Sequence, residues 1–314
     1  MSQSTNSTQS NTQGDRITLG VFLIIISTMC TATQDATFKF ASSDMTIWQI
    51  FTIRSAILIP ALFFVALVWG RAKGLWRTAM TFWPLMRALM FILMYVSMFA
   101  VIPFLDLAVV AAGLYTGPLW VALLSPLLMR EQVSLQEVMA IMLGFVGILV
   151  CLRPGTDAFT WSAAMPVLAG AFYALSAIIT RSKCRTTEPL ALSFALIIAL
   201  FAMGTVCSVA ILLIPLSAGL VEQSGFLFGG WAPMGQVEWA VIAVLSGVLL
   251  LNLVVLPIAY QSAKTVIIAT FDYMYLVWAT LLGLLIFNEP LDGTTITAML
   301  MITGAGFMIL RGAK

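Results

Sequence analysis

A stretch of thirteen residues occurs twice in this chain, 158 positions apart. It reads LWVALLSPLLMRE at Leu119–Glu131 and VWATLLGLLIFNE at Val277–Glu289, with the tryptophan, three leucines and the closing glutamate in register. Each copy is followed by an apolar stretch that contains glycines and ends at an arginine. The chain therefore holds two copies of one module, and internal duplication in an apolar chain is typical of secondary transporters.

The composition restricts the chain to the lipid bilayer. Hydrophobic residues make up 61% of the sequence and charged residues only 9%, which is too little polar surface to cover a soluble globule. The net charge of +2 and the scattered basic residues exclude a nucleic-acid partner. Without histidine or paired cysteine spacing, we expect no metal site and no cofactor.

The fold class predicted from hydropathy is an all-α membrane protein with ten transmembrane helices. An apolar helix needs about twenty residues to cross the hydrocarbon layer. The segment 1–16 is polar and predicts a disordered tail, followed by a first repeat over 17–153 and a second over 154–314. The predicted spans are 17–41, 46–69, 83–103, 107–129, 134–152, 160–180, 188–214, 238–259, 265–287 and 294–311.

The repeat offset also predicts how the two halves are oriented. It includes five crossings, an odd number, so the halves form an inverted-topology repeat. Positively charged residues are enriched in short cytoplasmic loops. With the N-terminus inside, most lysines and arginines fall on the cytoplasmic side, whereas Arg153 and Lys39 fall on or near the other. Both termini are therefore predicted to be cytoplasmic.

Several residues in this ten-span pattern resemble the EamA-type branch of the drug/metabolite transporter superfamily. They are Arg54 inside the second span, Arg87 at the start of the third, and Glu131 and Glu289 closing the fourth and ninth. The stretch LLMREQVSLQEVMAIMLGFVGILVCLRP is similar to the family's repeat. The resemblance implies a solute carrier of the bacterial inner membrane, often an exporter of amino acids or other small metabolites. Its cavity is expected between the halves, lined by spans one, three, four, six, eight and nine.

Asp272 is the sharpest candidate for a transport role. A charged side chain inside a span is costly, so it is by default a functional candidate. Asp272 lies about seven residues into the ninth span, with no basic residue on that span to neutralise it. A carboxylate in a low-dielectric site suits proton coupling or a counter-charge for a cationic substrate. The structural alternative is a protonated Asp272 bonded to a neighbouring helix.

A second polar group lies at one end of the first span. Asp35 and Arg54 are predicted at similar depth and are expected to pair, either to keep Arg54 buried or as part of a solute pathway. Gln34 and Lys39 make the same end of the span unusually polar, as a solute pathway requires. Arg87 lies near the start of its span, where we expect its long side chain to reach the headgroups.

Aromatic and amide side chains recur on the spans expected to line the cavity. Asn252 is predicted as a cavity contact because an amide facing lipid would be unsatisfied. Pro257, on the same span, removes a backbone hydrogen bond and either frees a carbonyl toward the cavity or only kinks the helix. The aromatic side chains form a binding cage or serve packing alone. They are Tyr95, Tyr115, Trp120, Tyr173, Tyr260, Tyr275 and Trp278.

The function predicted from these features is export or exchange of a small organic metabolite by alternating access. Uptake of a cationic or zwitterionic solute, such as a quaternary ammonium compound, is the alternative, because aromatic faces and carboxylates bind cations. A proton or a counter-substrate is the expected coupling partner, and the carrier is expected as a monomer or homodimer. A passive channel would need a continuous polar helix face, and an enzyme would need a catalytic motif; the sequence has neither.

Overall fold

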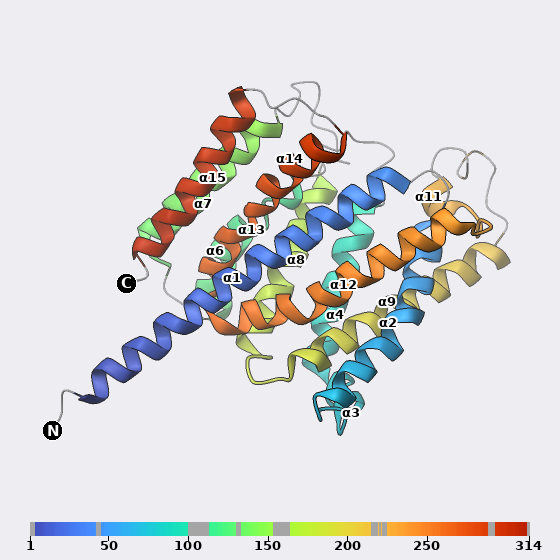
Figure 1. The fold of residues 1–314 in the computed structure, drawn as a ribbon, viewed down its shortest axis with the longest axis horizontal. Helices are drawn as coiled ribbons and strands as arrows, with labels where there is room; N and C mark the ends of the chain where they lie inside the picture. Colours follow the sequence, from blue (N-terminus) through green and yellow to red (C-terminus); the bar gives the residue numbers. More distant parts are fainter. Residues whose placement is uncertain are drawn as a thin grey trace.

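The computed structural model describes residues 4–41, 45–99, 113–129, 133–152, 164–214, 219, 221, 225–287 and 293–312. Every regular element in these ranges is a helix, which confirms the all-helical prediction (Figure 1). The helices are α1 (Ser4–Ala41), α2 (Ile47–Val68), α3 (Leu75–Ala79), α4 (Phe82–Phe99), α6 (Gly117–Met129), α7 (Leu135–Leu152), α8 (Ala164–Ser182), α9 (Pro189–Leu213), α11 (Gly225–Phe228), α12 (Gln236–Ser262), α13 (Thr265–Asp272), α14 (Met274–Phe287) and α15 (Gly293–Gly312).

The lengths of these helices reflect the apolar stretches of the sequence. Within the described residues, five helices are long and apolar enough to cross a membrane, namely α1 over Arg16–Gln34, α2, α8, α9 and α12. Shorter apolar helices occur in α4, α6 and α7. Helix α1 begins at Ser4, inside the segment predicted to be a disordered tail. A helix extends readily from an existing nucleus, because adding a residue costs less than starting a new helix.

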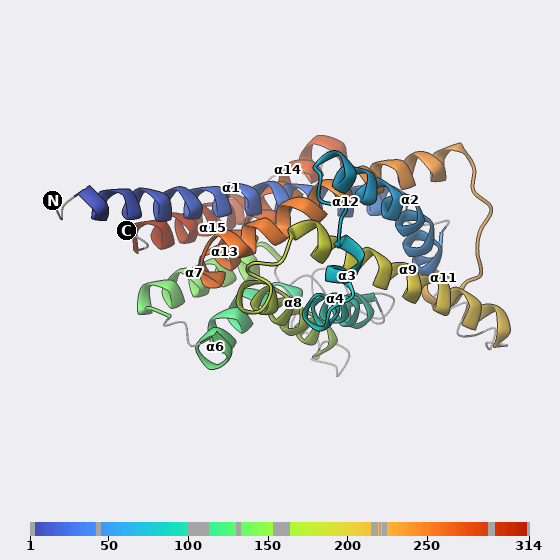
Figure 2. The same ribbon diagram turned by 90° about the horizontal axis from the view of Figure 1, so that it is seen from below.

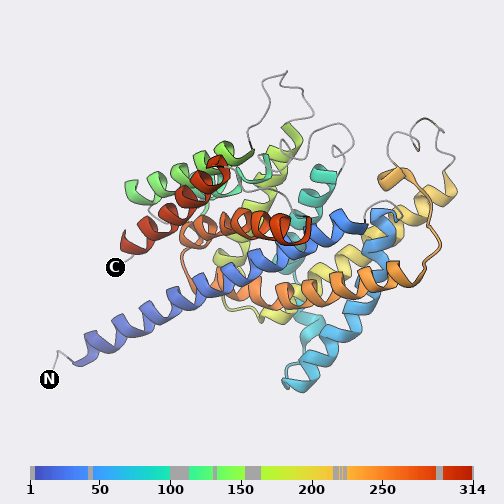
Figure 3. The ribbon, with the colours of Figure 1, turned by 45° about the horizontal axis from the view of Figure 1, so that its top comes forward.

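The helices pack as four main pairs. Helix α1 lies along α12, α2 along α9, α4 along α8, and α7 along α15 (Figures 1 and 3). The chain begins and ends at the same end of the bundle (Figure 2). Buried apolar side chains form one cluster among α2, α4, α8, α9 and α12 and a second around α13. Large apolar side chains remain exposed on the outer faces, as expected for helices that contact lipid.

The structure corrects the prediction for Arg87. Its side chain does not reach the headgroups, because α8 and α9 cover it and only 2% of it is exposed. Its Nε donates to Oγ1 of Thr180 at 2.7 Å, and its guanidinium lies 4.9 Å from the ring centre of Phe91. The hydroxyl of Thr180 and the ring of Phe91, which is also on α4, therefore accommodate the buried cation, and the bond to Thr180 joins α4 to α8.

Two helix breaks occur at matching positions of the sequence repeat. The ninth predicted span is divided into α13 and α14 at Tyr273, and α6 begins at Gly117, directly after a turn at Tyr115 and Thr116. Tyr115 and Tyr273 are 158 positions apart, which is the offset of the repeat. The first half of the chain therefore has a break before Gly117 that matches the break at Tyr273 in the second half.

Pro257 does not interrupt α12, which is continuous over Gln236–Ser262. Proline has no backbone N–H, so the carbonyl of Leu253, four residues earlier, loses its usual helical partner. The hydroxyl of Ser193 on α9 donates to that carbonyl. The freed carbonyl therefore serves helix packing and does not point into a cavity.

Candidate substrate-binding site

Asp272 is the last residue of α13 and is almost fully buried, with 8% of its surface exposed. Two tyrosine hydroxyls donate to its Oδ2, Tyr260 of α12 at 2.5 Å and Tyr173 of α8 at 3.0 Å. No side chain within the described ranges donates to Oδ1. This oxygen is also not one of the fully enclosed polar atoms of the described residues, so it remains accessible. Asp272 therefore keeps one oxygen available for a ligand.

Tyr173 connects this carboxylate to the other half of the chain. A Cβ added at Gly117 would lie 3.3 Å from Cδ1 of Tyr173, so the absence of a side chain there lets the tyrosine approach the start of α6. The Tyr173 ring also meets Phe91 of α4 edge to face, with ring centres 6.1 Å apart. The helix break of the first half and the carboxylate of the second half therefore lie on either side of one tyrosine.

Aromatic side chains gather around the two breaks. The rings of Tyr115 and Tyr275 lie 5.1 Å apart at an angle of 42°, so side chains from both halves meet directly. Tyr273 is fully buried against α7, and its hydroxyl has no hydrogen-bond partner among the described residues. The indole N–H groups of Trp120 and Trp278, which match each other in the repeat, are likewise buried without a partner in the described part of the chain. The site thus contains polar donors that the described protein groups do not satisfy.

Asn252 is placed between helices. Its Oδ1 accepts from Ser27 at 2.5 Å, and its Nδ2 donates to Thr31 at 3.2 Å, both on α1. These bonds join α12 to α1 and satisfy the amide inside the bundle.

The predicted polar group on α1 is only partly described. Gln34 accepts a hydrogen bond from Nη1 of Arg54 at 3.1 Å, and Arg54 is buried. The side chains of Asp35 and Lys39 lie outside the described part of the structure, so the expected pairing of Asp35 with Arg54 stays a prediction. Tyr95, also predicted to line the cavity, packs with its ring centre 5.6 Å from that of Phe51.

Tyr260 was predicted among the aromatic side chains of the cavity, but its contact with Asp272 was not predicted. This contact depends on the bend at Ala263 and Lys264, which folds α13 back against α12. A local sequence pattern does not reveal that contact.

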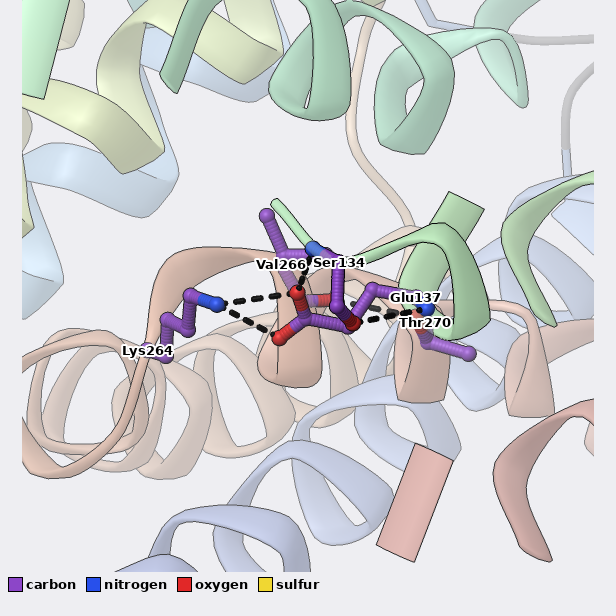
Figure 4. Close-up of polar contacts among 5 residues, drawn as sticks. All are labelled: Ser134, Glu137, Lys264, Val266 and Thr270. Carbon is purple, nitrogen blue, oxygen red and sulfur yellow. Dashed lines mark hydrogen bonds and ion pairs between the residues drawn. The ribbon is translucent and has the colours of Figure 1, made fainter. Parts of the chain in front are cut away.

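The other end of α13 carries an ion pair that the sequence analysis also missed. Lys264, the N-cap residue of α13, donates to Oε1 and Oε2 of Glu137 at 2.7 and 2.9 Å (Figure 4). Glu137 is in the first turn of α7, where its carboxylate also accepts from the backbone N–H of Ser134 at 2.7 Å. The Ser134–Glu137 spacing is that of a capping box, which was visible in the sequence, whereas the partner Lys264 was not.

Acidic and sulfur ligands do not cluster in the described ranges. No group of three or more histidine, cysteine, aspartate and glutamate side chains there is arranged to hold a metal ion. The chemistry available at Asp272 is therefore hydrogen bonding, charge pairing and proton binding by one carboxylate among tyrosines.

Comparison with known proteins identifies relatives of this chain. Residues 18–153 match the EamA-like transporter family. A riboflavin transporter of Brucella anthropi is 24% identical over 196 residues, which are 62% of this chain and 64% of the relative. One from Rhizobium johnstonii is 26% identical over 197 residues, covering 62% of this chain and 59% of the relative. An uncharacterized transporter of Helicobacter pylori is 26% identical over 208 residues, 65% of each chain.

Each of these matches spans less than two thirds of the relative's own length. A solved crystal structure shares the fold over nearly the whole molecule, with a TM-score of 0.72 at 16% identity, covering 94% of this chain and 96% of the other. EamA is a family of transporters and not of enzymes, which agrees with the expectation that the chain has no catalytic centre. The chain is a multi-pass membrane protein that is similar to the EamA-like transporter family over residues 18–153, less than half of its length.

Proposed function

We propose that this protein is a secondary transporter that moves a small organic metabolite, such as an amino acid, across the bacterial inner membrane. It works by alternating access, as an exporter or an exchanger. The observation that carries the proposal is Asp272, a buried carboxylate at a helix break with Oδ2 held by two tyrosines and Oδ1 open. Broken helices at a site between two halves are characteristic of carriers.

The pattern of helix contacts supports two inverted five-helix halves. The second-half counterparts of α1, α2, α4, α6 and α7 are α8, α9, α12, the α13–α14 pair and α15. Replacing each helix by its counterpart in the other half turns the α1–α12 contact into the α8–α4 contact. The same replacement leaves the α2–α9 and α7–α15 contacts unchanged. All four contacts are observed. The replacement likewise turns the observed α1–α14 contact into the observed α8–α6 contact. Such pseudo-twofold packing lets one half rock against the other.

The orientation follows from the distribution of charge. The connections from α2 to α4 and from α8 to α9 lie at one end of the bundle, which we call the basic end. These connections and the last turn of α8 carry Arg71, Lys73, Arg77, Arg181, Lys183 and Arg185. Short loops rich in lysine and arginine stay in the cytoplasm. The basic end, together with both chain termini, is therefore assigned to the cytoplasm.

The open oxygen of Asp272 favours a substrate that carries a hydrogen-bond donor, above all an amine. A cationic amine that pairs with the buried carboxylate neutralises the negative charge of the carboxylate, which little water is present to solvate. In the absence of substrate, a proton or a counter-substrate occupies the same oxygen, which provides a route to coupled exchange.

A flat heteroaromatic solute of the riboflavin kind is the second candidate. The pair Tyr115 and Tyr275 offers aromatic faces from both halves, and the indole N–H groups of Trp120 and Trp278 are unsatisfied donors for carbonyl groups. Two of the relatives are named riboflavin transporters. The same aromatic faces suit uptake of a quaternary ammonium solute, which contributes charge but no N–H donor.

Counterflow into vesicles that contain the purified protein tests these proposals. Amino acids, quaternary amines, organic anions and riboflavin are each loaded inside and tested for exchange. We expect Asp272→Asn to abolish exchange of the active solute while the protein stays folded in the membrane. Glu238→Gln, which changes a carboxylate that caps the start of α12, is the matched control and should exchange normally. Undiminished exchange by the Asp272→Asn protein would exclude the proposed site.

A further inference from the structure

Helix α13 is a short buried rod with a charged residue at each end. All eight of its residues are buried, from Thr265 to Asp272. The chain bends at Ala263 and Lys264 before it and turns at Tyr273 after it, so α13 is separated from both neighbouring helices. At about 1.5 Å per residue, the rod places Lys264 roughly 12 Å from Asp272 along its axis. A shift of α13 at Lys264 therefore also moves Asp272 at its other end.

The ion pair at the first end crosses between the two halves. Glu137 belongs to α7 of the first half and Lys264 to the second, and their side chains are 11% and 28% exposed. Partial burial reduces screening by solvent, so this pair is held more firmly than one on an open surface. Both carboxylate oxygens contact the ammonium group, which restricts how the two helices can shift (Figure 4).

The helix dipole increases the dependence of α13 on Glu137. Lys264 occupies the N-cap of α13, where the positive end of the dipole disfavours a cation. The carboxylate of Glu137 supplies the negative charge that this position favours. Removing that charge takes an anion away from a partly buried ammonium group and from the positive end of a helix.

We infer that Glu137 and Lys264 are positioning residues that clamp α13 and thereby hold Asp272 against its two tyrosines. The inference rests on the proposed function of Asp272. Alternating access changes the contacts between the halves. The Glu137–Lys264 pair must therefore loosen when the site at Asp272 switches from facing one side of the membrane to facing the other. The two equilibria are linked. If the intact Glu137–Lys264 pair changes the affinity of Asp272 for a ligand by some factor, then ligand binding at Asp272 changes the stability of that pair by the same factor.

The test uses variants that separate charge from capping. Glu137→Gln keeps a carbonyl oxygen that can accept from Ser134 and removes the charge. The matched control is Glu188→Gln, because Glu188 pairs with Arg71 at the same end of the bundle and also across the halves, without touching α13. Lys264→Arg keeps the cation, whereas Lys264→Met removes it.

Hydrogen–deuterium exchange of the protein in lipid nanodiscs is followed in the peptide that contains residues 265–272. We expect exchange there to be at least about fivefold faster in Glu137→Gln and Lys264→Met, and unchanged in Glu188→Gln and Lys264→Arg. For the solute that counterflow identifies, Glu137→Gln should raise the half-saturation concentration, whereas Glu188→Gln should not. Unchanged exchange in Glu137→Gln, or equal acceleration in Glu188→Gln, overturns the inference.

The exchange measurement needs no substrate, so the two failures are distinguishable. If Asp272→Asn transports normally while Glu137→Gln still loosens residues 265–272, the clamp on α13 stands and the proposed site is wrong. If Asp272→Asn is inactive and exchange in Glu137→Gln is unchanged, the site stands and the clamp is excluded.

Discussion

The hydroxyl of Ser193 donates to the backbone carbonyl of Leu253, the carbonyl in α12 that Pro257 leaves without a helical partner. This contact explains how a proline is accommodated within a continuous 27-residue helix inside a bundle. It also joins α9 to α12 at a point where both helices are buried.

Ser193→Ala should therefore destabilise the protein by about 1–3 kcal/mol, because a buried carbonyl loses its donor. Unfolding of the purified protein in mixed micelles measures the change. In the Pro257→Ala background, residue 257 regains an N–H and bonds that carbonyl itself, so Ser193→Ala should cost clearly less. Equal costs in both backgrounds would contradict this account.

Removing the tyrosine hydroxyls at Asp272 should impair transport in a graded way. Tyr260→Phe is expected to lower the rate of counterflow about tenfold or more, and Tyr173→Phe less, since their hydrogen bonds are 2.5 and 3.0 Å long. Because both donate to the same oxygen, the double variant should lose less than the product of the two single losses. Multiplicative losses would indicate that the tyrosines act independently of Asp272.

Gly144 should not tolerate a methyl group. A Cβ at this position would lie 2.3 and 2.5 Å from ring atoms of Tyr273, the residue that follows Asp272. Gly144→Ala should therefore displace that ring, lower stability by about 1–3 kcal/mol and reduce transport. Gly247→Ala in α12 is the control, since nothing lies within 4 Å of its Cβ and alanine favours a helix. Thermal unfolding and counterflow of both variants decide the matter.

Cys184, in the connection between α8 and α9, should react slowly with a soluble maleimide. It is fully buried, and this burial raises the pKa of its thiol, so less of the reactive thiolate is present at neutral pH. Labelling should accelerate as the pH approaches the raised pKa from below. Gln261 donates to the carbonyls of Cys184 and Thr187. Gln261→Ala should therefore release the connection and speed labelling of Cys184, as mass spectrometry of the labelled peptide will show.

Helix content and the membrane class were readable from the sequence because hydrophobicity over about twenty residues is a local property. The Gly117–Pro118 pair at the start of α6 is a local signal of the same kind, since glycine and proline act on their own backbone. Asp272 was found because an ionisable residue in an apolar span stands out without knowledge of its neighbours.

The partners of these residues were not readable, because each contact joins segments far apart in the chain. Tyr260 meets Asp272 across a turn, Arg87 is enclosed by α8 and α9, and Lys264 meets a glutamate 127 positions away. Asn252 illustrates the same limit: its need for hydrogen bonds was evident, but its use in joining α12 to α1 depends on packing.

The matching breaks at Tyr115 and Tyr273 have a consequence for how a solute is held. Two equivalent breaks facing each other would bind a small molecule equally well in either direction. Leu114 stands where the second half has Asp272, so only one of the two breaks carries a charge. If Asp272 binds the solute as proposed, the amine stays toward the second half whichever side of the membrane the carrier faces, and the solute crosses the membrane without turning around.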